Sequence, residues 1–109
     1  MAVSPKNGDV LRVNRGLYSH YGVYAADKNH VIHYTGTEGH SDFKGVVRET
    51  SLNEFLDGDD EFSVCRFDPE DYPHVYSGTE TVRRARARIG ERRYNLLGHN
   101  CEHFAVECK

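Results

Sequence analysis

The residues best placed to do chemistry are one cysteine and two histidines. Cys101 follows Asn100, a good helix N-cap, so the sequence predicts a terminal helix with Cys101 in its first turn. The unpaired N–H groups at a helix start favour thiolate over thiol and can receive an oxyanion, which makes Cys101 a candidate nucleophile. Phe104, Ala105 and Cys108 follow at helical spacing, so we expect the thiol to point toward the core.

A nucleophilic thiol needs a base, and His20 is the best candidate for it. His20 begins a predicted strand, and the next residue on its face is Gly22, which would leave room beside the imidazole. His33, on the following predicted strand, would hold the His20 ring in the useful tautomer, as a carboxylate or amide does in other triads. The predicted roles are Cys101 as nucleophile, His20 as general base and His33 as the residue that orients His20.

The two histidines can meet only in one register of a hairpin. Residues 18–26 and 30–35 are rich in Tyr, Val and Ile and flank a turn-forming cluster, so they are predicted strands. If the loop holds four residues, Ala25 pairs with His30, and the two histidines become diagonal neighbours on one face. A three-residue loop would put them on opposite faces. Ordinary core or surface histidines stay open as an alternative, because the chain has seven.

Strand patterns dominate the first two thirds of the chain. Besides the two histidine strands, strands are predicted at 8–13, 44–49 and 62–67, and the last of these is the final strand expected. Helices follow later. This segregation predicts an α+β fold with an antiparallel sheet and packed helices, and the length of 109 residues fits a single domain spanning 1–109.

Two serines begin capping-box patterns. Ser51 predicts a brief helix, and Ser77 predicts a longer helix that ends near Gly90. The core-facing stripe expected on the longer helix consists of Val82, Ala85 and Ile89.

Composition and charge narrow the class of function. Hydrophobic residues make up 38% of the chain and charged residues 28%, which is typical of globular proteins. A net charge of -3 gives no reason to expect a nucleic-acid partner. The sequence shows neither a signal-peptide run nor a membrane-spanning apolar stretch, so we expect a cytoplasmic protein. The three cysteines, odd in number and irregularly spaced, favour a reducing compartment over disulfides.

Longer strings around the candidate residues resemble one known family. The string around Cys101, with Asn-Cys-Glu-His-Phe at its centre, resembles the signature of the lecithin:retinol acyltransferase-like (LRAT domain) family, where it surrounds the catalytic cysteine. Segments that begin at Gly8, His20 and Val31 look like the family's first strand and its two histidine strands, and the segment after Ser51 looks like its short helix. The resemblance covers nearly the whole chain.

The resemblance implies both a fold and a reaction. It implies a circularly permuted papain-like fold, in which the histidine strands precede the cysteine helix, and a Cys101–His20–His33 triad without a cofactor. Known members take an acyl chain from a phosphatidylcholine-type lipid onto cysteine and pass it to an alcohol, an amine or water. A phospholipid or other acyl donor is therefore the expected partner.

Three other classes stay open. Permuted papain-like isopeptidases also carry Asn-Cys near a helix start, but they work with a dyad, so His33 favours the lipid family. A catalytically silent interaction domain would keep the fold and use Cys101 for packing. A metal-binding module could use the cluster of His99, Cys101 and His103 and the pair His30 and His33, but these match no standard finger spacing, so no metal is expected.

An arginine-rich run accompanies the predicted longer helix. We interpret it as a solvated helix face whose aliphatic stems cover apolar surface. The alternative is docking of anionic lipid headgroups, which would make the protein peripheral to a membrane. The run consists of Arg83, Arg84, Arg86, Arg88, Arg92 and Arg93.

Overall fold

One antiparallel sheet forms the centre of the protein, seen in a computed structural model that describes residues 4–14, 19–35, 44–56, 61–67, 70, 72–94 and 104–109. Its strand order is β5-β1-β2-β3-β4-β6. The strands are β1 (Val10–Asn14), β2 (Ser19–Ala25), β3 (His30–Thr35), β4 (Lys44–Ser51), β5 (Ser63–Val64) and β6 (Arg92–Tyr94). This arrangement confirms the expected α+β class with an antiparallel sheet and packed helices.

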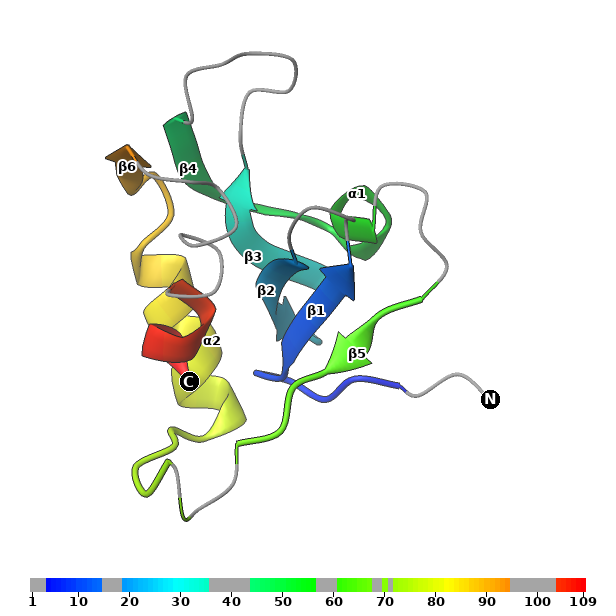
Figure 1. The fold of residues 1–109 in the computed structure, drawn as a ribbon, viewed down its shortest axis with the longest axis vertical. Helices are drawn as coiled ribbons and strands as arrows, with labels where there is room; N and C mark the ends of the chain where they lie inside the picture. The colour runs from blue at the N-terminus through cyan, green and yellow to red at the C-terminus, as the bar shows by residue number, and fades with distance from the viewer. Residues whose placement is uncertain are drawn as a thin grey trace.

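Helical segments cover both faces of the sheet. Helix α2 (Gly78–Ala87) and the helical residues 104–108 lie side by side on one face, and the short helix α1 (Leu52–Leu56) lies on the other (Figure 1). Strand alternation therefore sends successive residues into two separate apolar clusters. The cluster on the α2 face includes Val10, Val23, Ile32, Tyr34, Val82, Ala85, Phe104, Ala105 and Cys108. The cluster on the α1 face includes Leu11, Val13, Tyr24, Val31 and Phe55.

The hairpin of β2 and β3 has the predicted register. Ala25 pairs with His30 and Tyr24 with Val31, so residues 26–29 form a four-residue loop. Asn29 closes this loop with a φ of 57°, a left-handed conformation that asparagine tolerates. The structure therefore has the loop length that places both histidines on one face of the sheet.

The strand prediction for the second half of the chain is wrong in two places. The predicted 62–67 strand is too long: Ser63–Val64 forms β5 and pairs with β1, and the Cys65 N–H donates one more hydrogen bond to the Val10 carbonyl oxygen at 2.8 Å. It is also not the last strand, because Arg92–Tyr94 forms β6 at the other edge, next to β4. The charged sequence Arg-Arg-Tyr has no alternating pattern, so this strand depends on the tertiary pairing with β4.

Helix α2 begins after the predicted cap and ends before Ile89, the last residue of its predicted apolar stripe. The Ser77 side chain accepts a hydrogen bond from the backbone N–H of Glu80 at 3.2 Å, the expected cap. The helix ends at Ala87, and Gly90 follows with a φ of 96°. Ile89 therefore lies beyond the helix and is 47% exposed, so its assignment to the core stripe is wrong.

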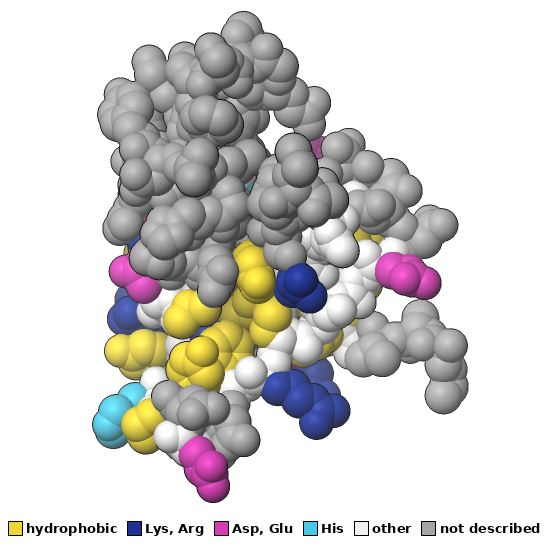
Figure 2. Space-filling view, viewed as in Figure 1, with side chains coloured by type: hydrophobic (Ala, Val, Ile, Leu, Met, Phe, Trp, Pro, Cys, Tyr) yellow, Lys and Arg dark blue, Asp and Glu magenta, His cyan; other side chains and the backbone are white. Residues whose placement is uncertain are grey.

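Apolar side chains also reach the surface. Tyr72, Val75 and Tyr76, which precede α2, are each at least 40% exposed. On the face drawn in Figure 2, apolar side chains gather at the surface with basic side chains beside them. No helix in the described part of the chain is long and apolar enough to cross a membrane.

Candidate active site

The structure brings two of the three predicted site residues together. His20 on β2 and His33 on β3 are each only 5% exposed, and His20 Nε2 lies 2.9 Å from His33 Nδ1. Their rings meet edge to face, with centroids 5.0 Å apart and planes at 87°. The diagonal contact that the hairpin register predicted is therefore present as a buried hydrogen bond.

Phe55 and Gly22 shape the packing around these rings. Phe55, from α1, stacks on His20 with centroids 5.1 Å apart and meets His33 edge-on at 5.0 Å. A Cβ at position 22 would lie 2.4 Å from a Val31 methyl carbon and 3.0 Å from the Phe55 ring. Gly22 is needed for this close packing, whereas the sequence suggested that it left open space. Phe55 was missed as a site residue because sequence alone did not show where α1 docks.

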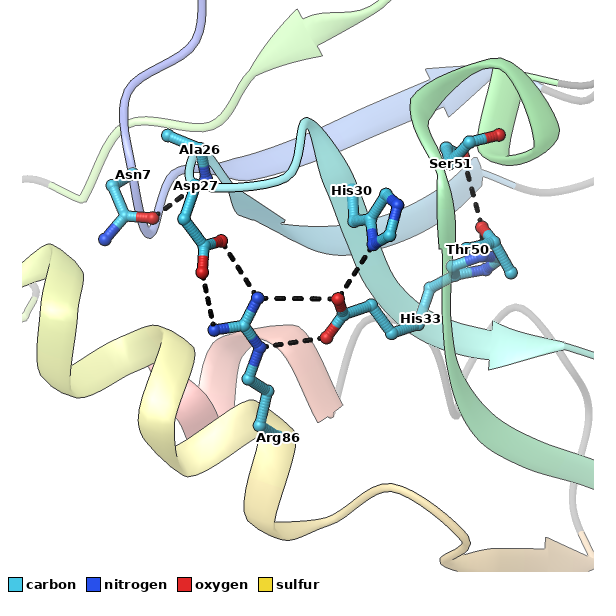
Figure 3. Close-up of polar contacts among 9 residues, drawn as sticks. Asn7, Ala26, Asp27, His30, His33, Thr50, Ser51 and Arg86 are labelled. Atoms are coloured by element: carbon cyan, nitrogen blue, oxygen red, sulfur yellow. Dashed lines mark hydrogen bonds and ion pairs between the residues drawn. The ribbon is translucent and has the colours of Figure 1, made fainter.

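A third polar residue extends the histidine pair toward β4. His33 Nε2 lies 2.8 Å from the Thr50 hydroxyl oxygen, and that hydroxyl donates to the carbonyl oxygen of Ser51 at 3.2 Å (Figure 3). Thr50 is a diagonal neighbour of His33, since the strand register pairs His33 with Arg48. This residue was also missed, because the long connection between β3 and β4 left that register unpredictable from sequence.

The opposite face of the same strands carries a charged network. His30 Nδ1 lies 2.8 Å from a Glu49 carboxylate oxygen, and Arg86 of α2 donates to Glu49 and to Asp27, each at 2.9 Å (Figure 3). The hydrogen bonds from Arg86 hold the pKa values of both carboxyl groups below their ordinary range. His30 thus faces away from His33, and the two cannot share a ligand.

The other described arginines of the run also contact neighbours within the chain. Arg83 donates to Glu80 at 2.9 Å and Arg88 to Glu91 at 2.7 Å, and Arg84 lies over the ring of Tyr76 at 4.2 Å. Arg83 is the most exposed of the arginines in these ion pairs, with 68% of its side chain accessible. The interpretation as a solvated face fits Arg83, whereas Arg84, Arg86 and Arg88 are partly buried in intramolecular contacts.

Cys101, the predicted nucleophile, lies outside the described residues. Three residues predicted to share its helical face, Phe104, Ala105 and Cys108, are buried as expected. They pack on the α2 face of the sheet, whereas the histidine pair lies on the α1 face with Phe55. The described residues therefore establish the histidine pair but not its contact with the thiol.

The other two cysteines have packing roles. Cys108 is 1% exposed, and burial raises the pKa of its thiol. Cys65 is partly buried against the cluster on the α2 face. Desolvation disfavours a thiolate, so the environment of Cys108 is that of a structural residue.

Comparison with known proteins defines the class of this small α+β protein with its buried histidine pair. The family model described as Lecithin retinol acyltransferase matches residues 3–109. The chain therefore belongs to the lecithin retinol acyltransferase family, as its motifs indicated.

Curated relatives match over almost the whole chain. Lecithin retinol acyltransferase of Rattus norvegicus is 30% identical over 94% of this chain and 53% of its own length. Phospholipase A and acyltransferase 3 of Mus musculus is 26% identical, covering 96% of this chain and 70% of its own. Phospholipase A and acyltransferase 1 of Homo sapiens is 30% identical, covering 94% and 66%. The chain thus spans about half of the first relative and about two thirds of the others.

Proposed function

We propose that this protein is a cysteine-dependent acyltransferase or phospholipase A-type enzyme that transfers an acyl chain from a phospholipid, through a Cys101 thioester, to an alcohol, an amine or water. The buried hydrogen bond between His20 and His33 carries the proposal, because a general base needs a partner that fixes its ring. Family membership and the names of the relatives support the reaction class. No cofactor is required for this chemistry.

The proposed reaction has two halves joined by the thioester. His20 takes the proton from the Cys101 thiol, and the thiolate attacks the ester carbonyl carbon of the lipid. The backbone N–H of Cys101 stabilises the tetrahedral oxyanion. When the intermediate collapses, the ester C–O bond breaks and His20 returns the proton to the departing lysophospholipid oxygen.

In the second half His20 acts as base toward the acceptor. It removes a proton from the alcohol, amine or water as that group attacks the thioester carbonyl carbon. The C–S bond then breaks, and the proton on His20 restores the Cys101 thiol. His33 keeps its hydrogen bond to His20 Nε2 throughout, so this scheme assigns His20 Nδ1 to the thiol.

The proposal places a condition on the segment before Phe104. Phe104 lies on the α2 side, and three residues of extended chain span at most about 10 Å. His20 lies at the beginning of β2 and His33 near the end of β3, which is the same end of the sheet. The proposal therefore requires Cys101 to reach His20 around this end of the sheet.

We extend the proposal to the whole chain. Residues 1–109 would act as one catalytic domain with the circularly permuted papain-like arrangement of the family. The order of the elements supports it, because the histidine strands β2 and β3 precede the helical residues 104–108.

The test is the intact mass of the protein after exposure to phosphatidylcholine vesicles. We expect an adduct of one acyl mass in the wild type and in Cys65→Ala, no adduct in Cys101→Ala, and less adduct in His20→Ala. Cys65→Ala is the matched control, because Cys65 is a partly buried packing residue.

Two other outcomes would redirect the assignment. Without an adduct, fast alkylation of Cys101 that slows in His20→Ala would indicate a peptide or isopeptide substrate. Without either signal, a catalytically silent interaction domain would replace the enzyme.

A further inference from the structure

Thr50 terminates the hydrogen-bond chain of the histidine pair at a backbone carbonyl. The chain runs from His20 Nε2 to His33 Nδ1 over 2.9 Å, and from His33 Nε2 to the Thr50 hydroxyl over 2.8 Å. Thr50 in turn donates its hydroxyl hydrogen to the Ser51 carbonyl oxygen at 3.2 Å. The last acceptor gives the chain a direction, because a carbonyl oxygen never donates.

This direction determines which ring nitrogens carry protons. The Thr50 hydroxyl has one hydrogen, and with that hydrogen on the Ser51 carbonyl its oxygen is left to accept from His33. His33 Nε2 therefore carries a proton, and neutral His33 presents a lone pair at Nδ1. His20 Nε2 faces that lone pair and must carry a proton too, so neutral His20 has its lone pair at Nδ1.

We infer that Thr50 is a positioning residue that fixes His20 in the Nε2-protonated tautomer through His33, leaving Nδ1 as the basic nitrogen. The inference rests on the proposed function only where it assigns that nitrogen to Cys101. With the opposite tautomers, His33 Nδ1 would donate to His20 Nε2, and the proton of His20 would sit on Nδ1. A ring in that state cannot accept the thiol proton.

The same chain suits the charged state of His20. When Nδ1 accepts a proton, the Nε2–H bond to His33 becomes charge-assisted and gains strength. His33 and Thr50 keep their protons in place, so no proton has to move along the chain. The arrangement orients and stabilises the base without taking part in the transfer.

Thr50→Val separates this role from simple packing. Valine keeps the branched shape of threonine but provides no acceptor for His33 Nε2–H, whereas Thr50→Ser keeps the hydroxyl. We would record long-range ¹H–¹⁵N spectra of the histidine rings for both variants in a Cys101→Ala background. The background removes any effect of a thiolate on His20.

Protonated and unprotonated ring nitrogens are resolved in such spectra. We expect His20 Nδ1 to be unprotonated in the Cys101→Ala parent and in Thr50→Ser, and to become partly protonated in Thr50→Val. An unchanged His20 tautomer in a folded Thr50→Val variant would overturn the inference, as would a parent with the proton on Nδ1.

Alkylation of Cys101 by iodoacetamide at neutral pH gives a second readout. With Cys101 intact, we expect Thr50→Val to slow the reaction about fivefold, the effect of one hydrogen bond, and Thr50→Ser to restore it. Equal rates in the two variants would contradict a role for Thr50 in reactivity. If His20→Ala leaves alkylation unchanged while Thr50→Val still shifts the tautomer, the proposed function fails and the tautomer assignment stands.

Discussion

The two faces of the sheet place histidines of one strand in opposite environments. On the α1 face, His33 is 5% exposed and its hydrogen bonds run to His20 and Thr50. On the α2 face, the side chain of His30 is 34% exposed and bonds to the Glu49 carboxylate. The three-residue spacing between them is odd, so strand alternation alone separates these environments.

Burial determines what each group of contacts can do. An unsatisfied polar group in a buried site costs about 1–3 kcal/mol. The hydrogen bonds that connect His20, His33 and Thr50 therefore restrict these side chains to one arrangement. Ion pairs near the surface contribute about 0–1 kcal/mol, because water and salt screen them. The α1 face therefore holds two imidazole rings in a fixed arrangement, whereas the network on the α2 face joins separate elements to one another.

The charged network has a clear structural role of its own. Arg86 connects α2 to Asp27 in the hairpin loop and to Glu49 on β4. These three points are far apart in the sequence, and the network joins them beside the α2-face cluster. It fixes the helix against the hairpin that carries both site histidines on its other side.

The largest expected effect comes from removing the Phe55 ring, which packs against both histidines. Phe55→Ala should lower the free energy of unfolding by about 3–5 kcal/mol, because a fully buried aromatic ring leaves a cavity. It should also broaden the ring signals of His20 and His33, since Phe55 contacts both. Urea unfolding and histidine NMR spectra measure the two effects.

Ile89→Ala is the matched control for the other face. Ile89 is 47% exposed, so its truncation should change the unfolding free energy by less than about 0.5 kcal/mol. If Phe55→Ala lowered the unfolding free energy no more than Ile89→Ala, the contrast between close packing around the histidines and an exposed residue after α2 would be wrong.

Local pattern predicted the histidine pair but not its surroundings. The sequence left a three-residue and a four-residue loop open, and the structure has the four-residue loop, which pairs Ala25 with His30 and puts both histidines on one face. The capping residues Ser51 and Ser77 were equally readable, since each bonds to a backbone N–H three residues later. These features depend on neighbours within a few residues.

The features that could not be predicted from the sequence depend on contacts between residues far apart in the chain. Thr50 meets His33 through a register set across residues 36–43, and Phe55 meets the rings only after α1 docks. The strand Arg92–Tyr94 has no pattern of its own and pairs only because β4 presents an edge. The role of Cys101 stays a prediction from its motif, since it lies outside the described residues.

A smaller effect is expected from breaking the charged network. Arg86→Met should lower the unfolding free energy by about 1 kcal/mol after allowance for solvent screening, and the loss should shrink in high salt. Arg83→Met is the control, since the ion pair of Arg83 within the described part of the chain is with its helix neighbour Glu80 and Arg83 is more exposed, and we expect no measurable change. Equal losses in both variants, independent of salt, would show that Arg86 acts through packing of its aliphatic stem.

The smallest expected effect is the acid sensitivity of the same network. Hydrogen bonding from Arg86 lowers the pKa of Glu49 in the folded protein below its ordinary value of 4.5. A carboxyl group with a depressed folded pKa adds stability above its unfolded pKa, and this contribution is lost as the pH falls through the folded value. Urea midpoints of the wild type and Glu49→Gln should therefore differ most near neutral pH and converge below pH 4.5.

The acid series also sharpens the contrast between the two faces. Among the described contacts on the α1 face, from Phe55 to Thr50, the titratable groups are imidazoles, so a pH dependence of the cost of Phe55→Ala should appear between about pH 7 and pH 5, where free imidazole titrates, and not in the carboxyl range below it. Parallel midpoints for the wild type and Glu49→Gln down to pH 3 would show that the ionised form of Glu49 contributes nothing to folding. The network would then be a set of surface contacts, and apolar packing, including that of Val82 and Ala85, would hold α2 against the sheet.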